Sequence, residues 1–357
     1  MIRLNGARYR SGTAVLLLAL VFLAAVPVPA AVVPDLYAAT VPVADASPEA
    51  TAAAFAQALR QVLGKVSGRP GAAGDAALLA HFRDPAALVQ QYRRDGAGSL
   101  WASFDPSAVR AGLDAAGQPV WGEDRPITLV WLAYDNGAGE RDVLAGGGND
   151  SPAAAQLRRG LEEAAAASGV PVLLPLRDSE ELAAVAFADV WGDFTEPLQR
   201  ASQRYRADAL LIGRARLFPP GMDDVRWTLL AGDERLEWRG GIADGPRGLA
   251  ERLSQRLALP AGAQASELRL AVSGIGSLDD YGVVLGFLRN LSMVESAGVG
   301  FIAGDTLVFD LELRGTRSQL ETALGLRALI EPATEPVVAL PAGMVPPELR
   351  YRLVARR

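Results

Sequence analysis

The sequence predicts an α+β protein of several domains, in which two α/β units follow a helix-rich N-terminal segment. Between residues 123 and 260, nearly continuous apolar runs alternate with capped helical patterns, which is typical of a mixed sheet covered by helices. Between residues 261 and 332 the order is strand, helix, strand, strand, helix, strand, as in a ferredoxin-like domain. With 357 residues, half of them hydrophobic, the chain is long enough to form two or three cores.

The first 30 residues have the pattern of a secretory signal peptide. Three arginines precede an apolar run of 13 residues, Ala14–Val26, and small residues follow up to Ala30 and Ala31. A membrane-spanning helix needs about 20 apolar residues, so this run favours a cleaved signal. We expect cleavage between Ala30 and Ala31 and release into the periplasm, with an uncleaved inner-membrane anchor as the alternative.

The composition excludes several classes of function. Cleavage would remove three of the 35 basic residues and none of the 41 acidic ones, leaving 32 minus 41, a net charge of −9. Because backbone phosphates dominate affinity for nucleic acid, such an acidic chain is not expected to bind it. The chain has no cysteine and one histidine, which leaves no disulfide, no lipid-attachment cysteine and no metal site built on these residues. No cofactor is expected.

The segment 31–122 is expected to be helix-rich. Ser47 is suited to the N-cap of a helix, and apolar residues recur behind it at helical spacing as far as a Ser-Gly-Arg-Pro stop. The elements expected after it are short helices at 76–82 and 85–91, a strand at 100–104, and a helix from Asp105-Pro106 to near Gly117.

The segment 123–260 is expected to form a mixed α/β domain. Its elements are strands at 127–134, 170–174 and 209–217, helices at 151–168, 197–205 and 246–257, and a hairpin with a turn at Gly232-Asp233. This turn would place Trp227 opposite Trp238, Leu229 opposite Leu236 and Thr228 opposite Glu237. It would also place Arg226 opposite Arg239, and this like-charge pair argues mildly against the register.

The segment 261–332 is expected to be the ferredoxin-like domain. Ser277 would cap a helix whose buried stripe is Leu278, Tyr281, Leu285 and Leu288. The tail, 333–357, carries four prolines and is expected to be mobile. Its end, Arg350–Arg357, carries four arginines, which fits a frayed terminus or a weak contact with an anionic membrane surface.

No motif in the sequence assigns a catalytic residue, a cofactor-binding residue or a metal ligand. The glycine-containing turn at 272–277 has Asp279 where a dinucleotide-binding turn needs Gly or Ala, so it predicts a tight turn and a helix cap. His81 has no triad around it and is expected on the surface or in packing. The acidic pairs are expected at solvated helix ends and loops; they are Glu162-Glu163, Glu180-Glu181, Asp223-Asp224 and Asp279-Asp280.

Several short stretches resemble a family of Gram-negative proteobacterial proteins of unknown function, the domain of unknown function numbered 2066. The stretches that carry the resemblance are 36–43, 56–69, 89–93, 100–101 with 104–106, 119–122, and 125–126 with 129–132. This resemblance implies an exported protein and supplies no activity. The order of elements over 127–258, with Tyr205–Gly213 leading into the hairpin, is similar to the amino-terminal domain of periplasmic TolB-type proteins, which implies binding of a partner.

Two hypotheses of function remain open. The first is a non-enzymatic periplasmic protein that binds or assembles with another envelope component, expected to be a protein. The second is a periplasmic hydrolase of a glycan, which needs a cleft with two carboxylates at a working separation, one of them with a raised pKa. The junction between the second and third segments is the place where such a cleft would lie.

Overall fold

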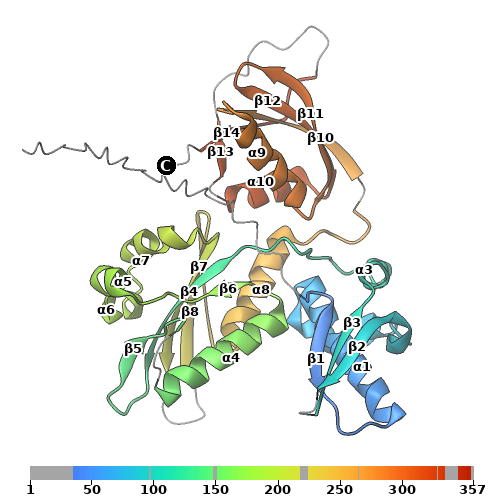
Figure 1. Ribbon diagram of the computed structural model, residues 1–357, viewed down its shortest axis with the longest axis vertical. Coiled ribbons are helices and arrows are strands. Elements are labelled where there is room, and N and C mark those ends of the chain that lie inside the picture. The colour runs from blue at the N-terminus through green and yellow to red at the C-terminus, as the bar shows by residue number, and fades with distance from the viewer. Residues whose placement is uncertain are drawn as a thin grey trace, which may run out of the picture.

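The computed structural model describes residues 35–95, 98–147, 151–217, 224–263, 265–327, 329–333 and 345–354, which form three units (Figure 1). Each unit has its own sheet and its own hydrophobic core, so the predicted α+β multidomain class is confirmed. The predicted signal segment, with Ala30 and Ala31, lies outside the described residues.

The first unit is a three-stranded antiparallel sheet, in the order β1-β3-β2, with a long helix on one face. Its elements are β1 (Ala38–Pro42), α1 (Pro48–Ser67), η1 (Pro70–Gly74), α2 (Ala76–Leu79), η2 (Pro85–Leu88), β2 (Val89–Asp95), β3 (Ser99–Phe104) and α3 (Pro106–Ala115). The Ser47 side chain accepts a hydrogen bond from the Ala50 amide at 3.1 Å, and α1 ends at Gly68 in the left-handed region. Both ends of α1 are therefore where its capping residues predict them.

The first unit contains more strand than its sequence pattern predicts. The helix expected at 85–91 is a single 3₁₀ turn, η2, followed by β2, which pairs with β3. β1 was not expected and pairs with the other edge of β3. β2 is almost wholly exposed, so neither face carries an apolar alternation that reveals a strand. Pairing with the neighbouring strand β3 decides its conformation.

The middle unit is a mixed sheet in the order β5-β4-β7-β8-β9, with β6 also pairing with β4. Its elements are β4 (Thr128–Asp135), β5 (Arg141–Val143), α4 (Pro152–Ser168), β6 (Val172–Leu173), α5 (Ser179–Ala184), α6 (Phe187–Trp191), α7 (Thr195–Ser202), η3 (Gln203–Tyr205), β7 (Ala209–Arg216), β8 (Asp224–Ala231), β9 (Glu234–Gly240) and α8 (Asp244–Leu257). The strand pairs β4–β7 and β4–β6 are parallel, and the others are antiparallel.

Helices cover the two faces of this sheet unequally. On one face α4 and α8 pack against alternate residues of β4, β7 and β8, among them Leu132, Leu211 and Trp227. On the other face α5, α6 and α7 pack mainly over β4 and β7, around Trp131 and Ile212. Every residue of β4 is buried, as its continuous apolar run predicts. The short helices α5 and α6 were not predicted.

The predicted hairpin register is confirmed in every pair. Trp227 lies opposite Trp238, Leu229 opposite Leu236, Thr228 opposite Glu237, and Arg226 opposite Arg239. Gly232 has a φ of +59° and Asp233 follows without a positive φ, which is the pattern of a type II′ turn. The like-charge arginine pair is therefore part of the native sheet.

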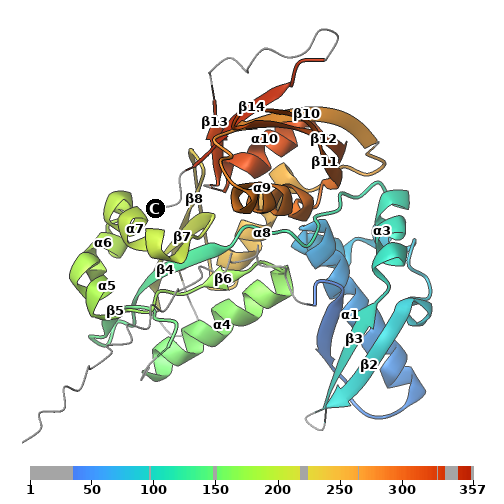
Figure 2. The same ribbon diagram turned by 45° about the horizontal axis from the view of Figure 1, so that its top comes forward.

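The third unit has the sheet order β11-β12-β10-β14-β13, with α9 and α10 on one side (Figure 2). Its elements are β10 (Ala265–Ser273), α9 (Leu278–Asn290), β11 (Val294–Ala303), β12 (Thr306–Arg314), α10 (Arg317–Gly325), β13 (Ile330–Pro332) and β14 (Leu349–Leu353). The first three strands have the predicted ferredoxin-like arrangement, in which β12 lies antiparallel between β10 and β11.

The expectation of a mobile tail is wrong for residues 349–353. They form β14, which runs parallel to β10 and separates it from β13. Leu349 and Tyr351 are buried in the core of this unit, while Arg350 is exposed and Arg352 pairs with Glu331. A five-residue alternation beside prolines is a weak signal in the sequence, and the open edge of β10 gives it a partner.

The expected stripe of α9 is confirmed for Tyr281, Leu285 and Leu288, which pack in the core, and is wrong at its first residue. Ser277 caps the helix as predicted, accepting from the Asp280 amide at 3.1 Å. Leu278 was expected in the core but is 86% exposed, because the buried positions of α9 are Val284, Phe287 and Leu288. No helix among the described residues combines the length and the apolar character that crossing a membrane requires.

Candidate functional site

The linker between the first and middle units is held by one buried arginine. Arg125 is fully buried, and its guanidinium donates to five backbone carbonyls, from Lys65, Trp121, Gly122, Ser168 and Gly169. It also lies over the Trp121 ring, 4.0 Å from its centroid. Burial lowers the pKa of Arg125 to about 9. These contacts come from α1, the linker and the end of α4, so Arg125 joins the first two units.

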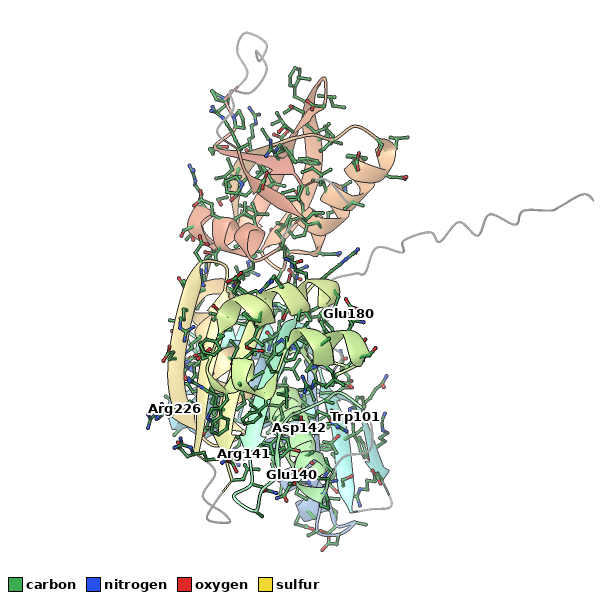
Figure 3. The ribbon with its side chains drawn as sticks, turned by 90° about the vertical axis from the view of Figure 1, so that its left-hand side faces the viewer. Trp101, Glu140, Arg141, Asp142, Glu180 and Arg226 are labelled. Atoms are coloured by element: carbon green, nitrogen blue, oxygen red, sulfur yellow. The ribbon has the colours of Figure 1, made fainter. Side chains whose placement is uncertain are left out.

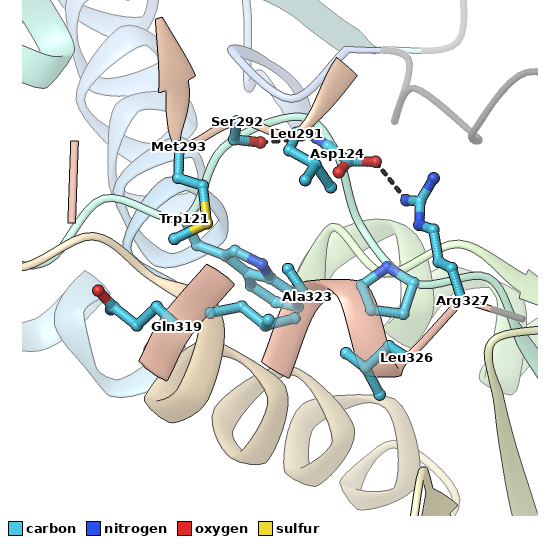
Figure 4. A pocket seen from close by; sticks show the side chains of 11 residues that line it. Trp121, Asp124, Leu291, Ser292, Met293, Gln319, Ala323, Leu326 and Arg327 are labelled. Carbon is cyan, nitrogen blue, oxygen red and sulfur yellow. Dashed lines mark hydrogen bonds and ion pairs between the residues drawn. The ribbon is translucent and has the colours of Figure 1, made fainter. Parts of the chain in front are cut away.

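The third unit meets the linker through two carboxylates that share one arginine. Arg327 forms an ion pair with Asp124, and its Nε lies 3.9 Å from Oδ1 of Asp208 (Figure 4). Asp208 also accepts from the Ile127 amide at 2.8 Å, and the Asp124 amide donates to Ser292 at 3.1 Å. Burial raises the pKa of Asp124, and it raises that of Asp208 to about 6 although Arg327 and the Ile127 amide act in the opposite direction.

This junction encloses a small cavity rather than a substrate cleft. Its volume is about 30 Å³, enough for one or two water molecules, whereas small-molecule sites span about 300–1,000 Å³. The indole nitrogen of Trp121 faces this space and has no hydrogen-bond partner among the described residues, so a water molecule is the occupant that fits. A glycosidase needs a sugar between its carboxylates, and here one guanidinium occupies that position. The junction is therefore a structural joint.

The uncovered part of the middle sheet carries a different group of residues. Arg214 of β7 lies opposite Arg226 of β8, which lies opposite Arg239 of β9. We call these three residues the arginine row. They point to the same face as Ile212 and Leu230, which pack under α5–α7, so the row continues that face beyond the helices. Figure 3 shows Arg226 beside the strands, clear of the helices in front of the sheet.

Asp193 holds the inner end of the arginine row. It follows α6 with a φ of +59°, a conformation uncommon outside glycine, and its side chain is 6% exposed. Its Oδ2 accepts from Arg235 at 2.6 Å and from Thr228 at 2.9 Å, and it lies 3.3 Å from Nη2 of Arg214. Asp193 thus fixes Arg214, while Arg226 and Arg239 have no hydrogen-bond or ion-pair partner among the described residues.

The face as a whole is positive on an acidic chain. It carries six arginines and four carboxylates, which are Arg141, Arg214, Arg216, Arg226, Arg235, Arg239, Asp135, Asp193, Asp224 and Glu237. Asp193 and Glu237 both contact Arg235, at 2.6 and 2.9 Å. The local excess of two positive charges contrasts with the net charge of −6 for the whole chain, so this face is suited to an anionic group.

The residues singled out in the sequence do not gather at either place. His81 is exposed just after α2, and Glu162 and Glu163 are exposed on α4. Glu181 is buried, where its carboxylate accepts from the Arg177 amide at 2.7 Å and from the Tyr205 hydroxyl. Asp279 and Asp280 lie in the first turn of α9, as expected. Asp223 and the last three residues of the arginine-rich tail lie outside the described residues.

The sequence already contained part of the signal for the arginine row. The hairpin pattern placed Arg226 opposite Arg239, and we interpreted this pair only as evidence against the register. The sequence did not indicate that Arg214 joins this pair, because no local pattern predicts the register between β7 and β8. The junction residues Asp124, Asp208 and Arg327 come from three distant stretches and share no local motif.

One comparison with known proteins gives a match. Residues 30–122 are similar to a family described as a domain of unknown function, DUF8605. The match covers 93 of the 357 residues, which are the first unit and the start of the linker. No curated protein and no solved structure matches the chain.

Proposed function

We propose that this protein is a non-catalytic binding protein of the cell envelope, exported by a cleaved signal peptide. The observation that carries the proposal is the arginine row, three in-register cations on a sheet face that helices leave open. Like charges directly opposite each other destabilise a sheet, so a fold that keeps them gains from an external partner of opposite charge. The partner is another envelope component, bound through an acidic group.

Two further observations support this proposal. The family match begins at residue 30, beside the expected cleavage between Ala30 and Ala31. The resemblance of the middle unit to TolB-type amino-terminal domains fits partner binding. The hydrolase alternative gains no support from the junction, where Arg327 lies against both carboxylates and the cavity has room for only one or two water molecules.

Photo-crosslinking in intact cells tests the proposal. A photoreactive residue replaces Glu237, which is exposed beside the arginine row, and the matched control replaces Glu163, exposed on α4 across the sheet. We expect a reproducible product from position 237 that position 163 does not give, and a mature N-terminus at Ala31 on sequencing. Equal products from both positions, or none from 237, would contradict the proposed function.

A further inference from the structure

The arginine row brings three guanidinium groups close to one another. Adjacent strands lie about 4.8 Å apart, so the α-carbons of Arg214, Arg226 and Arg239 span roughly 10 Å across three strands. An arginine side chain is long enough for all three guanidinium groups to reach a single ligand group above β8. The argument depends on where these three residues lie. That they are arginines carries no weight, because every basic residue of the chain except Lys65 is an arginine.

The carboxylates on the same face leave the outer part of the row uncompensated. Asp193 and Glu237 both contact Arg235, and Asp193 also contacts Arg214. Asp224 lies in the neighbouring register pair, opposite Arg216. Arg226 and Arg239 thus present their charges to solvent together, with no partner among the residues that the structure describes.

Arg214 supplies a second, independent observation. Its Nε is buried without an acceptor among the described residues, as is Oδ1 of Asp193 without a donor, although Nη2 of Arg214 lies against Oδ2 of Asp193. A buried donor without an acceptor destabilises the fold. Asp193 already fixes the side chain, so little conformational entropy would be lost on binding.

We propose that the arginine row binds a phosphate group, as a phosphate ester or as the headgroup of an anionic phospholipid. A carboxylate offers two oxygens in one plane, which one guanidinium can occupy. A phosphate offers oxygens in several directions, and these suit donors that converge from three strands. This inference rests on the proposed function, since it names the chemical group that the same face recognises.

Binding of the full mature chain to two probes tests the inference. Inorganic phosphate is titrated by calorimetry at low ionic strength, and vesicles of phosphatidylcholine with and without phosphatidylglycerol are used in flotation. We expect binding to at least one probe, lost as salt rises. Binding to phosphate alone indicates a soluble phosphate ester, and binding to the phosphatidylglycerol vesicles indicates a headgroup. Binding to neither probe overturns the inference.

Two double variants distinguish binding at the arginine row from a general effect of the net charge. Arg226→Gln with Arg239→Gln removes two charges from the row, and Arg60→Gln with Arg159→Gln removes two exposed charges from α1 and α4. We expect the first double variant to weaken binding at least about tenfold and the second to leave it within about twofold. Equal weakening by both overturns the inference.

Two further measurements keep the outcomes distinct. The single variant Arg239→Gln, on the edge strand β9, repeats the test if the double variant unfolds. A crosslinked product from position 237 without binding of either probe would support the proposed function and overturn the inference of a phosphate site. Binding of phosphate without a crosslinked product from position 237 would support the phosphate site and contradict the proposed function.

Discussion

At the scale of single residues, buried charges and their backbone partners determine how the chain is joined. Within the part of the chain that the structure describes, Arg125 has no carboxylate partner, and its guanidinium donates to carbonyls from three stretches of the chain. Its position before Pro126 was visible in the sequence as part of a resemblance. Its role was not, because the carbonyls that it contacts belong to α1, the linker and the end of α4. A periodicity argument concerns side chains and cannot indicate which backbone groups need a donor.

Replacing Arg125 tests this role. Arg125→Met keeps much of the apolar stem and leaves buried carbonyls without a donor, so we expect a loss of about 3 kcal/mol in the free energy of unfolding. Urea denaturation of the full chain measures it. The control is Arg159→Met on the exposed face of α4, which should change stability by less than about 0.5 kcal/mol. Similar losses in both variants would contradict the role of Arg125.

The raised pKa of Asp208 predicts that the free energy of unfolding falls as the pH rises. Its pKa is about 6 in the folded protein against 3.8 for an unperturbed group, so the folded state holds a proton that the unfolded state has lost. Stability therefore falls as pH rises from about 4 to 6, and the cost is fully present above pH 6. Asp208→Asn removes this cost and keeps an acceptor for the Ile127 amide.

We expect Asp208→Asn to raise the midpoint of thermal unfolding more at pH 7.5 than at pH 4.5. Asp233→Asn, in the turn between β8 and β9, is the control and should show no such difference between the two pH values. A gain for Asp208→Asn that is the same at both pH values, or larger at the lower one, would show that burial of Asp208 does not govern the effect.

At the scale of elements, local signals succeeded where they were strong. Ser47, Asp105, Ser151 and Ser277 each cap the helix that the sequence assigned to them, because capping depends on neighbouring residues only. The hairpin register followed from its turn and its cross-strand pairs. β2, which pairs without an apolar face, and β14, which lies between β10 and β13, were missed. The conformation of β14 depends on strands remote in the sequence, whereas β2 pairs with its neighbour β3 and lacks the apolar alternation that reveals a strand.

The strand β14 predicts that the end of the chain stabilises the third unit. Tyr351 is buried in the core of this unit, whereas Arg350 on the same strand is exposed. Tyr351→Ala should therefore cost about 3 kcal/mol, as large-to-small changes in cores do, while Arg350→Ala should be nearly neutral. Thermal unfolding followed by calorimetry measures both. Equal effects of the two variants would contradict the position of β14.

At the scale of the whole molecule, three units with separate cores meet around the linker at 118–127. The first two are joined through Arg125 and the third through Asp124 and Arg327, with a further bond from Gln319 to the Ala258 carbonyl at 2.8 Å. The sequence predicted the number and class of these units, since each core leaves its own apolar pattern. It could not predict the junction, which depends on residues that are distant in sequence.

The arginine row shows how a candidate site can contradict local rules of stability. The sheet would be more stable without three arginines in register, and the chain keeps them on a face that its helices leave open. Natural proteins break such rules mainly at functional sites. The row is therefore the feature of the molecule on which the proposed binding of a partner rests.

Crosslinking from position 237 in cells that express the Arg226→Gln/Arg239→Gln protein tests this account most directly. The wild-type chain and the Arg60→Gln/Arg159→Gln chain carry the same photoreactive residue and serve as the comparison. The account predicts that the product forms with the wild-type and control chains and falls at least about tenfold with the row variant. An equal yield from all three chains, with all three folded and exported, would contradict it.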